Sequence, residues 1–448
     1  MLSVREAEAR AASLVEAAKR AGADAADVIY LGDASTGVHV RLGELENVER
    51  SEGEDIGLRF FIGSRSASVS SSDLSAEALE DLVERASAMA REAPEDPYAG
   101  LAPEERLLRE GGVAIDGDDG SDPKPTEMKA QALATEDAAR SITGITNSEG
   151  ASVSAGRSVI ALATSHGFCR GYTTSGYTAT ASVIAGTGAG MQRDYASHSA
   201  RYLADLDPPE AIGRLAAERA LARLNPGGMQ SGTMPVVFDP RVGATLLGHL
   251  LSAMTGSAIA RKTSFLLGRE EAPIFPESIT ISEDPHKRRG LRSKAFDGEG
   301  VATRPRNLIE AGRVTGWLLD SASARQLGLE PTGHASRSVG GAPSAGVTNV
   351  DLLPGEASPE ELMADIRHGL YVVELIGQGV NPVTGDYSRG ASGFIIENGR
   401  IGAPVAEITI AGNLIDMFAT LKAANDLEQR RATNVPTLRV EGMMVAGA

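Results

Sequence analysis

Seven histidines and a single cysteine are the side chains of this sequence best suited to hold a metal ion or to act as a nucleophile. No two of the histidines lie within five residues of each other, so no local pair can form a metal site. The sequence has no His-Glu-x-x-His, Cys-x-x-Cys, Gly-x-Ser-x-Gly or phosphate-loop motif. A site assembled from distant histidines stays open. The histidines are His39, His166, His198, His249, His286, His334 and His368.

Cys169 follows His166 by three residues, in a segment rich in Val, Ile and Thr. Residues three apart on a strand point to opposite faces, so this spacing disfavours a nucleophile–base pair. We therefore predict a small buried or half-buried thiol. His249 lies among leucines in a helix predicted over 241–256, and we interpret it as a hydrogen-bonded core or interface residue.

Two polar segments are candidates for ligand binding. Arg193, Asp194 and Tyr195 follow a predicted strand and would serve either in peptide binding or subunit contact, or as a structural Arg–Asp pair at the strand end. Gln378 and Asn381 lie in GQGVNPVTGDYS, where glycines let a backbone approach and amides can hydrogen-bond it. That stretch suits a peptide binder, but a tight crossover between strands is slightly favoured.

Two further motifs have simple structural interpretations. The GTGAG segment at 186–190 lacks a βα context, so it predicts a hairpin turn and not a dinucleotide loop. Asp297 and Glu299 predict a charged turn, which would bind a cation only with more ligands than the local sequence provides.

The composition excludes several classes of protein. The net charge is −17 and aromatic residues are only 4% of the chain, which argues against binding to nucleic acids or to an anionic membrane surface. A lone cysteine fits a reducing compartment. The first 22 residues predict an amphipathic helix and not a signal peptide, and no apolar run is long enough to cross a bilayer. We expect a soluble, cytoplasmic protein.

The pattern of elements predicts an α+β fold. Ser3 and Glu6 form a capping box for the first helix, and alternating apolar and polar residues over 26–72 predict antiparallel strands. Helix and strands then recur, and the half beyond a Pro/Gly break at 224–232 is mostly β with a few helices. The predicted division is an N-terminal α+β domain (1–92), a linker or loop (93–125), a central α+β region (126–226) and a mostly β C-terminal domain (227–448).

Several blocks, taken together and in order, resemble the PmbA (TldE) branch of the TldD/PmbA family, which also carries the label of DNA gyrase modulator. These blocks are VIAGTGAGMQRDY, SAMTGSAIARKTSFL, DGEGVATRPRNLIEAGRVTGWLLDSASARQLG, PTGHASR, PSAGVTN, GQGVNPVTGDYSRGASGFIIENGRIGAPV and LRVEGMMVAG. In the TldD-type members of this family, a His-Glu-x-x-x-His element on a helix and a cysteine near the C-terminus hold zinc, and the Glu acts as general base.

The resemblance places this chain's degenerate version of that element on the helix predicted over 241–256. An alignment anchored on Gly256 puts Leu247 at the first His, Gly248 at the Glu and Ser252 at the second His. His249 is nearby but out of register, and the C-terminal cysteine is absent. The resemblance therefore implies no catalytic residue, no metal and no cofactor in this chain.

By the same resemblance, this chain would be the non-catalytic subunit that pairs with a zinc-bearing TldD-type subunit. The pair would cleave unfolded or extended peptides, and this chain would supply part of the substrate chamber and the partner interface, partly by strand addition. Two alternatives remain: a self-sufficient metallopeptidase with unrecognised ligands, and a homodimeric peptide-binding scaffold. Whether the chain itself is an enzyme is left open, and it could form a homodimer when alone.

Overall fold

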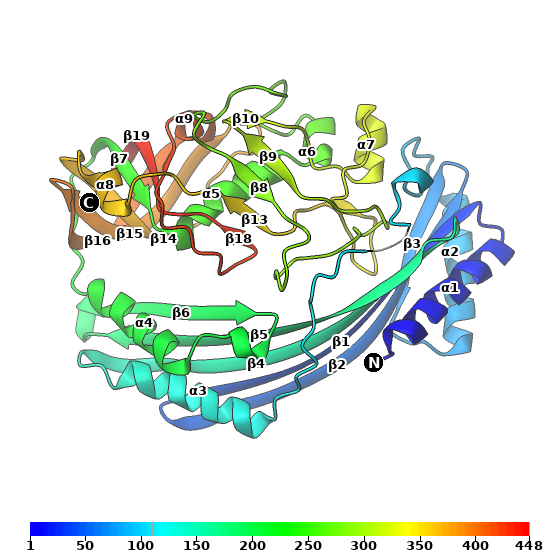
Figure 1. Cartoon of the computed structure of the whole chain (residues 1–448), viewed down its shortest axis with the longest axis horizontal. Helices are drawn as coiled ribbons and strands as arrows, with labels where there is room; N and C mark the ends of the chain where they lie inside the picture. Colours follow the sequence, from blue (N-terminus) through cyan, green and yellow to red (C-terminus); the bar gives the residue numbers. More distant parts are fainter. Residues whose placement is uncertain (110–111, 448) are drawn as a thin grey trace.

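The structure is a computed structural model that describes residues 1–109 and 112–447. It has a long curved antiparallel sheet in the N-terminal half, and a C-terminal half built on a strand barrel that lies over the concave side of this sheet (Figure 1). Helices and strands share the chain, and the C-terminal half is mostly strand, so the predicted α+β class is confirmed.

The N-terminal sheet has six strands in the order β3-β2-β1-β4-β5-β6, and every neighbouring pair is antiparallel. Helices α1 and α2 pack at one end of it, and α3 and α4 at the other (Figure 1). The strands are β1 (Ala25–Arg41), β2 (Glu44–Ile62), β3 (Arg65–Ser71), β4 (Ile145–Thr164), β5 (Cys169–Ala185) and β6 (Gln192–Ala200). The helices are α1 (Val4–Arg20), α2 (Ala76–Glu92), α3 (Pro125–Arg140) and α4 (Pro209–Ala222).

Local sequence accounts for the ends of these elements. The Ser3 side chain accepts a hydrogen bond from the Glu6 N–H, and the Glu6 carboxylate accepts one from the Ser3 N–H, which confirms the predicted capping box. The 186–190 segment turns the chain from β5 into β6, as predicted. The predicted linker 93–125 separates two segments that share one sheet, because β1 and β4 pair from Asp27↔Thr164 to Val40↔Ala151.

Five strands of the C-terminal half close into a barrel. β14 pairs with β7 and β15, β19 pairs with β7, and β16 pairs with both β15 and β19, so the ring has no free edge. The barrel strands are β7 (Gly232–Phe238), β14 (His368–Ile376), β15 (Asp386–Glu397), β16 (Arg400–Asn413) and β19 (Leu438–Ala446). Asn398 and Gly399, both at positive φ, make the tight turn predicted between β15 and β16.

A second, five-stranded sheet runs in the order β10-β9-β8-β13-β18, and its side chains join those of the barrel in one large apolar core. The remaining elements are α5 (Pro240–Ala253), α6 (Gly256–Ala260), α7 (Ser321–Leu327), α8 (Pro359–Met363), α9 (Leu414–Ala419), β8 (Ile281–Glu283), β9 (Arg306–Glu310), β10 (Arg313–Val314), β11 (Ala335–Ser336), β12 (Ser344–Ala345), β13 (Val350–Leu352), β17 (Lys422–Ala423), β18 (Thr433–Asn434) and the 3-10 turns η1 (Glu104–Arg106), η2 (Gly188–Gly190) and η3 (Leu203–Asp205).

Two predicted helices are wrong in length. The helix predicted over 414–427 ends at Ala419, because the following residues leave the helix to pair with β19 as β17. The helix predicted over 241–256 ends at Ala253, and α6 begins at Gly256, whose N–H donates to Leu318 O. Among the helices that the structure describes, none is long and apolar enough to span a bilayer.

Candidate functional site

Helix α5 carries the three positions that the sequence aligns with a zinc motif, and these positions face different ways. Leu247 is only 3% exposed and packs in the C-terminal core. Gly248 and Ser252 are exposed, and because they are four residues apart they lie on the same side of the helix. A Cβ atom added at Gly248 would meet no atom within 4 Å. At these positions the outer face of α5 thus carries the hydrogen atom of Gly248 and the hydroxyl of Ser252. Leu247, at the first position of the motif, packs in the core.

His249 lies at the centre of a small polar cluster between α5 and β15. Its ring meets that of Tyr387 edge-to-face, with 6.1 Å between centroids. Among the described residues, His249 Nε2, Tyr387 Oη and Arg389 Nε are buried without a hydrogen-bond partner. The prediction of a hydrogen-bonded histidine is therefore wrong for Nε2. Burial and then the charge of Arg389 lower the pKa of His249, so its imidazole is neutral at pH 7.

No three His, Cys, Asp or Glu side chains between residues 1 and 109 or 112 and 447 are grouped so that they could share a metal ion. Cys169 begins β5 and is exposed, so the prediction of a buried or half-buried thiol is wrong. The two ring nitrogens of His166 lie 2.7 Å from Thr164 Oγ1 and 3.0 Å from Ala102 O, so this ring is engaged away from the thiol.

Asp194 connects the N-terminal sheet to α5. The carboxylate is 3% exposed and accepts hydrogen bonds from Arg241 Nη1 at 2.6 Å and from Arg223 Nη1 at 3.2 Å. Arg223 also pairs with Glu374 on β14. Burial alone would raise the pKa of Asp194, but the hydrogen bonds and charge of Arg241, with the charge of Arg223, hold it below its usual value. This ion cluster fixes β6, α4, α5 and β14 against one another.

Asp194 forms structural Arg–Asp pairs, as one of the two interpretations predicted, but its partners are Arg241 and Arg223 and not Arg193. Arg193, Asp194 and Tyr195 lie inside β6, where neighbouring side chains point to opposite faces. Asp194 therefore turns inward to Arg241, and Arg193 turns outward to Glu149, 3.3 Å away. Tyr195 is exposed on the same outer side as Arg193.

The other predicted binding segment is a turn between β14 and β15. Asn381 Oδ1 accepts hydrogen bonds from the N–H groups of Val383, at 2.9 Å, and Thr384, at 3.3 Å. The Phe265 N–H donates to Pro382 O at 2.8 Å, so the turn packs on the chain after α6. Gln378 is exposed. The structure supports the crossover interpretation for Asn381, whose amide oxygen is used locally.

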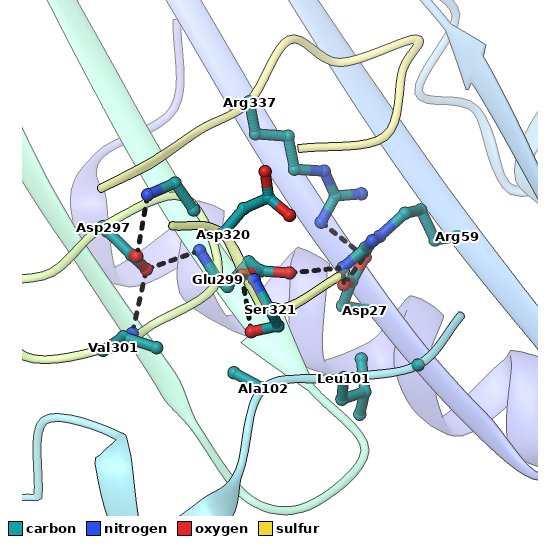
Figure 2. Close-up of polar contacts among 12 residues, drawn as sticks. Asp27, Arg59, Leu101, Ala102, Asp297, Glu299, Val301, Asp320, Ser321 and Arg337 are labelled. Atoms are coloured by element: carbon teal, nitrogen blue, oxygen red, sulfur yellow. Dashed lines mark hydrogen bonds and ion pairs between the residues drawn. The ribbon is translucent and has the colours of Figure 1, made fainter. Parts of the chain in front are cut away.

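A buried ionic network joins the two halves of the molecule and was missed from the sequence (Figure 2). Asp27 on β1 accepts hydrogen bonds from Arg59 on β2 and from Arg337, which lies between β11 and β12. Glu299 Oε1 lies 3.9 Å from Arg59 Nη2, and Glu299 Oε2 accepts from the N–H and hydroxyl of Ser321. No local motif reveals this network, because Asp27 and Arg337 are 310 residues apart.

Asp297 and Glu299 lie in the predicted turn, which the Gly300 N–H closes by donating to Asp297 O at 3.1 Å, and both residues are part of this buried region. They are 2% and 3% exposed, and the carboxylate of Asp297 is hydrogen-bonded to backbone N–H groups around it. Its Oδ1 accepts from the N–H groups of Glu299 and Val301, and its Oδ2 accepts from that of Ala335, at 2.9 to 3.0 Å (Figure 2).

The region holds several acids and bases close together. Asp27, Asp297, Glu299 and Asp320 are four buried carboxyl groups, and the neighbouring cations are Arg59, Lys294, Arg325 and Arg337. Burial and then the charge of Glu299 raise the pKa of Asp297 to about 7. One proton is therefore retained in this network below neutral pH.

We expect the substitution Asp297→Asn to destabilise the fold by about 1–3 kcal/mol, because an amide offers one acceptor oxygen where two are used. The pKa of Asp297 is higher in the folded chain than in the unfolded one, so its contribution to stability is lost as pH rises toward 7. The stability difference between the parent chain and the variant should therefore shrink from about pH 5 to about pH 7 in urea unfolding. A constant difference across this range would contradict a raised pKa.

Family models match three consecutive segments of this architecture. They are the PmbA/TldA metallopeptidase domain 1 over residues 26–90, the central domain over 118–224 and the C-terminal domain over 231–447. The chain belongs to the PmbA/TldD metallopeptidase family.

Individual relatives cover nearly the whole chain. Metalloprotease PmbA of Escherichia coli O157:H7 is 39% identical over 426 residues, which is 95% of this chain and 92% of the relative. The Metalloprotease PmbA homolog of Haemophilus influenzae is 35% identical over 460 residues and covers 100% of this chain and 98% of its own.

Solved structures agree with this relationship. The crystal structure of a suggested modulator of DNA gyrase from Bacteroides thetaiotaomicron superposes with a TM-score of 0.92 at 27% identity and covers 100% of both chains. That of TldE from Thermococcus kodakarensis superposes with a TM-score of 0.86 over 97% of this chain and 99% of its own; at 22% identity it shows a shared fold.

Proposed function

We propose that this chain is the non-catalytic subunit of a cytoplasmic zinc peptidase and that a TldD-type partner carries the zinc. The observation that carries this proposal is the outer face of α5. Gly248 and Ser252 lie exposed on that face, and neither glycine nor serine is a metal ligand or general base of the kind that zinc peptidases use. Leu247 contributes to the core instead of the face.

The chain would contribute a structural framework and a substrate-binding surface, and its partner would supply the catalytic groups. The strand β6 ends the N-terminal sheet and pairs only with β5 among the described strands, so the later part of its other edge, beyond Tyr195, is available to an extended peptide. The ion cluster around Asp194 holds this edge at a fixed position against α5. Unfolded or extended peptides suit such an edge, because strand addition binds the backbone and accepts many sequences.

A second candidate is a peptidase that works without a partner. The relative of 39% identity bears the name Metalloprotease PmbA, and that name favours a chain with its own activity. Such an enzyme would need a metal site that no recognised motif in this chain supplies.

The two candidates differ in a reconstitution assay. An unfolded fluorogenic peptide is incubated with this chain, with a TldD-type partner from the same organism, and with both. We expect chelator-sensitive cleavage with both chains and none with this chain alone. A partner whose motif histidines are replaced by alanine is the matched control and should abolish cleavage by the pair. Cleavage by this chain alone, removed by a chelator, would establish the second candidate.

A further inference from the structure

A cavity of about 290 Å³ lies where the end of β6 meets two loops of the C-terminal half. The residues of β6 that line it are 198–200; the loops are 287–291, after β8, and 429–431, before β18. Six basic side chains line this cavity, and Asp205 is the acidic one among its lining residues. The six, which we call the basic cavity, are Arg201, Lys287, Arg288, Arg289, Arg430 and Arg431. Such a cluster is unexpected in a chain of net charge −17.

Four of the six bases are paired with carboxylates around the rim. Arg288 and Arg289 share Asp116, at 2.9 and 3.2 Å. Lys287 Nζ lies 3.6 Å from Asp351, and Arg430 pairs with Asp207. These ion pairs place the cationic groups around the cavity.

The other two bases have no carboxylate within 4 Å among residues 1–109 and 112–447. Arg201 donates to the backbone carbonyls of Ser175, at 2.8 Å, and Leu291. Arg431 is exposed, and its described side-chain hydrogen bond is a long one, 3.3 Å, from Nη1 to Arg241 O. The guanidinium of Arg431 therefore retains donors and a positive charge for a ligand.

The free edge of β6 leads into this cavity. Near its start the edge is closed, since the carbonyl of Arg193 accepts a hydrogen bond from Arg223, which follows α4, and that of Tyr195 accepts one from Arg219 of α4. Alternate residues of an edge strand direct their backbone groups away from the sheet, so Ser197 and Ser199 offer the next outward pairs. Ser199 itself lines the cavity.

We propose that the basic cavity binds a carboxylate of an extended peptide whose backbone pairs with β6 at Ser197 and Ser199. The carboxylate is that of an Asp or Glu side chain or of the peptide's C-terminus. Its natural partner here is Arg431, because a guanidinium binds a carboxylate through two parallel hydrogen bonds. This inference rests on the proposed function for the peptide nature of the ligand. It adds that the chain selects acidic segments at this point.

The test measures peptide binding to the full chain by fluorescence anisotropy, in chelator and without a partner subunit. The probes are a labelled unstructured peptide with Glu residues, the same peptide with Gln in their place, and both with an amidated C-terminus. We expect the Glu peptide to bind about tenfold more tightly than the Gln peptide, and this preference to weaken at high salt. If the C-terminal carboxylate is the bound group instead, the Glu and Gln peptides bind alike, and amidation weakens both about tenfold.

Single substitutions test whether Arg431 causes the preference for the acidic peptide. Arg431→Gln should weaken binding of the acidic peptide about tenfold and leave the amidated Gln peptide, which has no carboxylate, unchanged. Arg400→Gln, at an exposed hairpin turn with no described ion pair, is the matched control and should change neither. Equal affinity of all four probes, amidated and not, or displacement by inorganic phosphate with the same dependence on Arg431, would overturn the proposal. In a parallel sample without chelator, cleavage of the probe by this chain alone would count against the proposed function and leave the charge preference standing.

Discussion

Replacing Asp194 by alanine should destabilise the folded chain by about 3–5 kcal/mol, because it leaves two buried arginines without their shared counter-ion. Arg241 and Arg223 have side chains only 8% and 10% exposed, so water cannot replace the lost carboxylate fully. Arg223 would keep Glu374, and Arg241 would keep only the longer contact of 3.9 Å to Asp239. Urea unfolding followed by circular dichroism measures the loss.

The neighbouring residue is the control for this prediction. Arg193 is exposed, and its pair with Glu149 is a surface pair at 3.3 Å, so Arg193→Ala should change stability by less than about 1 kcal/mol. Equal effects of the two substitutions would show that the cluster around Asp194 does not hold β6 against α5. A further expectation is that Asp194→Ala weakens peptide binding at β6, because this edge loses its fixed position.

Placing histidine at position 247 should destabilise the chain by about 3–5 kcal/mol and should not create a zinc site. Leu247 packs in the C-terminal core, so Leu247→His removes apolar contacts and buries an imidazole with no described partner. The substitutions at the other two positions of the motif act on an exposed face. Gly248→Glu should stabilise the chain by about 0.5–1 kcal/mol, because glycine is a poor helix former and the new side chain meets no atom.

The triple variant Leu247→His, Gly248→Glu, Ser252→His tests whether the motif can be restored. We expect it to unfold at lower urea than the parent chain and to bind no stoichiometric zinc. Ser252→His alone is the control for adding a histidine to the exposed face, and it should stay within about 1 kcal/mol of the parent. Tight zinc binding by a folded triple variant would mean that α5 can turn position 247 outward, against the packing seen here.

Local patterns predicted the elements of the fold well. The capping box at Ser3, the strands of the N-terminal sheet and the tight turn before Arg400 all follow from residues within a few positions of each other. The ends of α5 and α9 did not follow, since each is set by a hydrogen-bonded partner from another segment. The closure of the barrel through β16 and β19 also depends on pairing that no local pattern encodes.

The candidate site was predicted less well, because its contacts are long-range. Asp194 was singled out as a polar residue, but its partners Arg223 and Arg241 are 29 and 47 residues away and were not foreseen. Asp194 does not pair with Arg193, because neighbouring side chains on a strand point to opposite faces of the sheet. The basic cavity brings together segments 198–201, 287–291 and 429–431, which lie far apart in the sequence, so no local pattern indicates it.

The zinc content and activity of the purified full-length chain test the central claim most directly. The chain is prepared in zinc-containing buffer, dialysed, and analysed by metal mass spectrometry beside its TldD-type partner, and each is then assayed on an unfolded peptide. The account predicts zinc well below one equivalent and no cleavage for this chain, zinc near one equivalent for the partner, and chelator-sensitive cleavage by the pair. One equivalent of zinc in this chain, together with chelator-sensitive cleavage by it alone, would contradict the account.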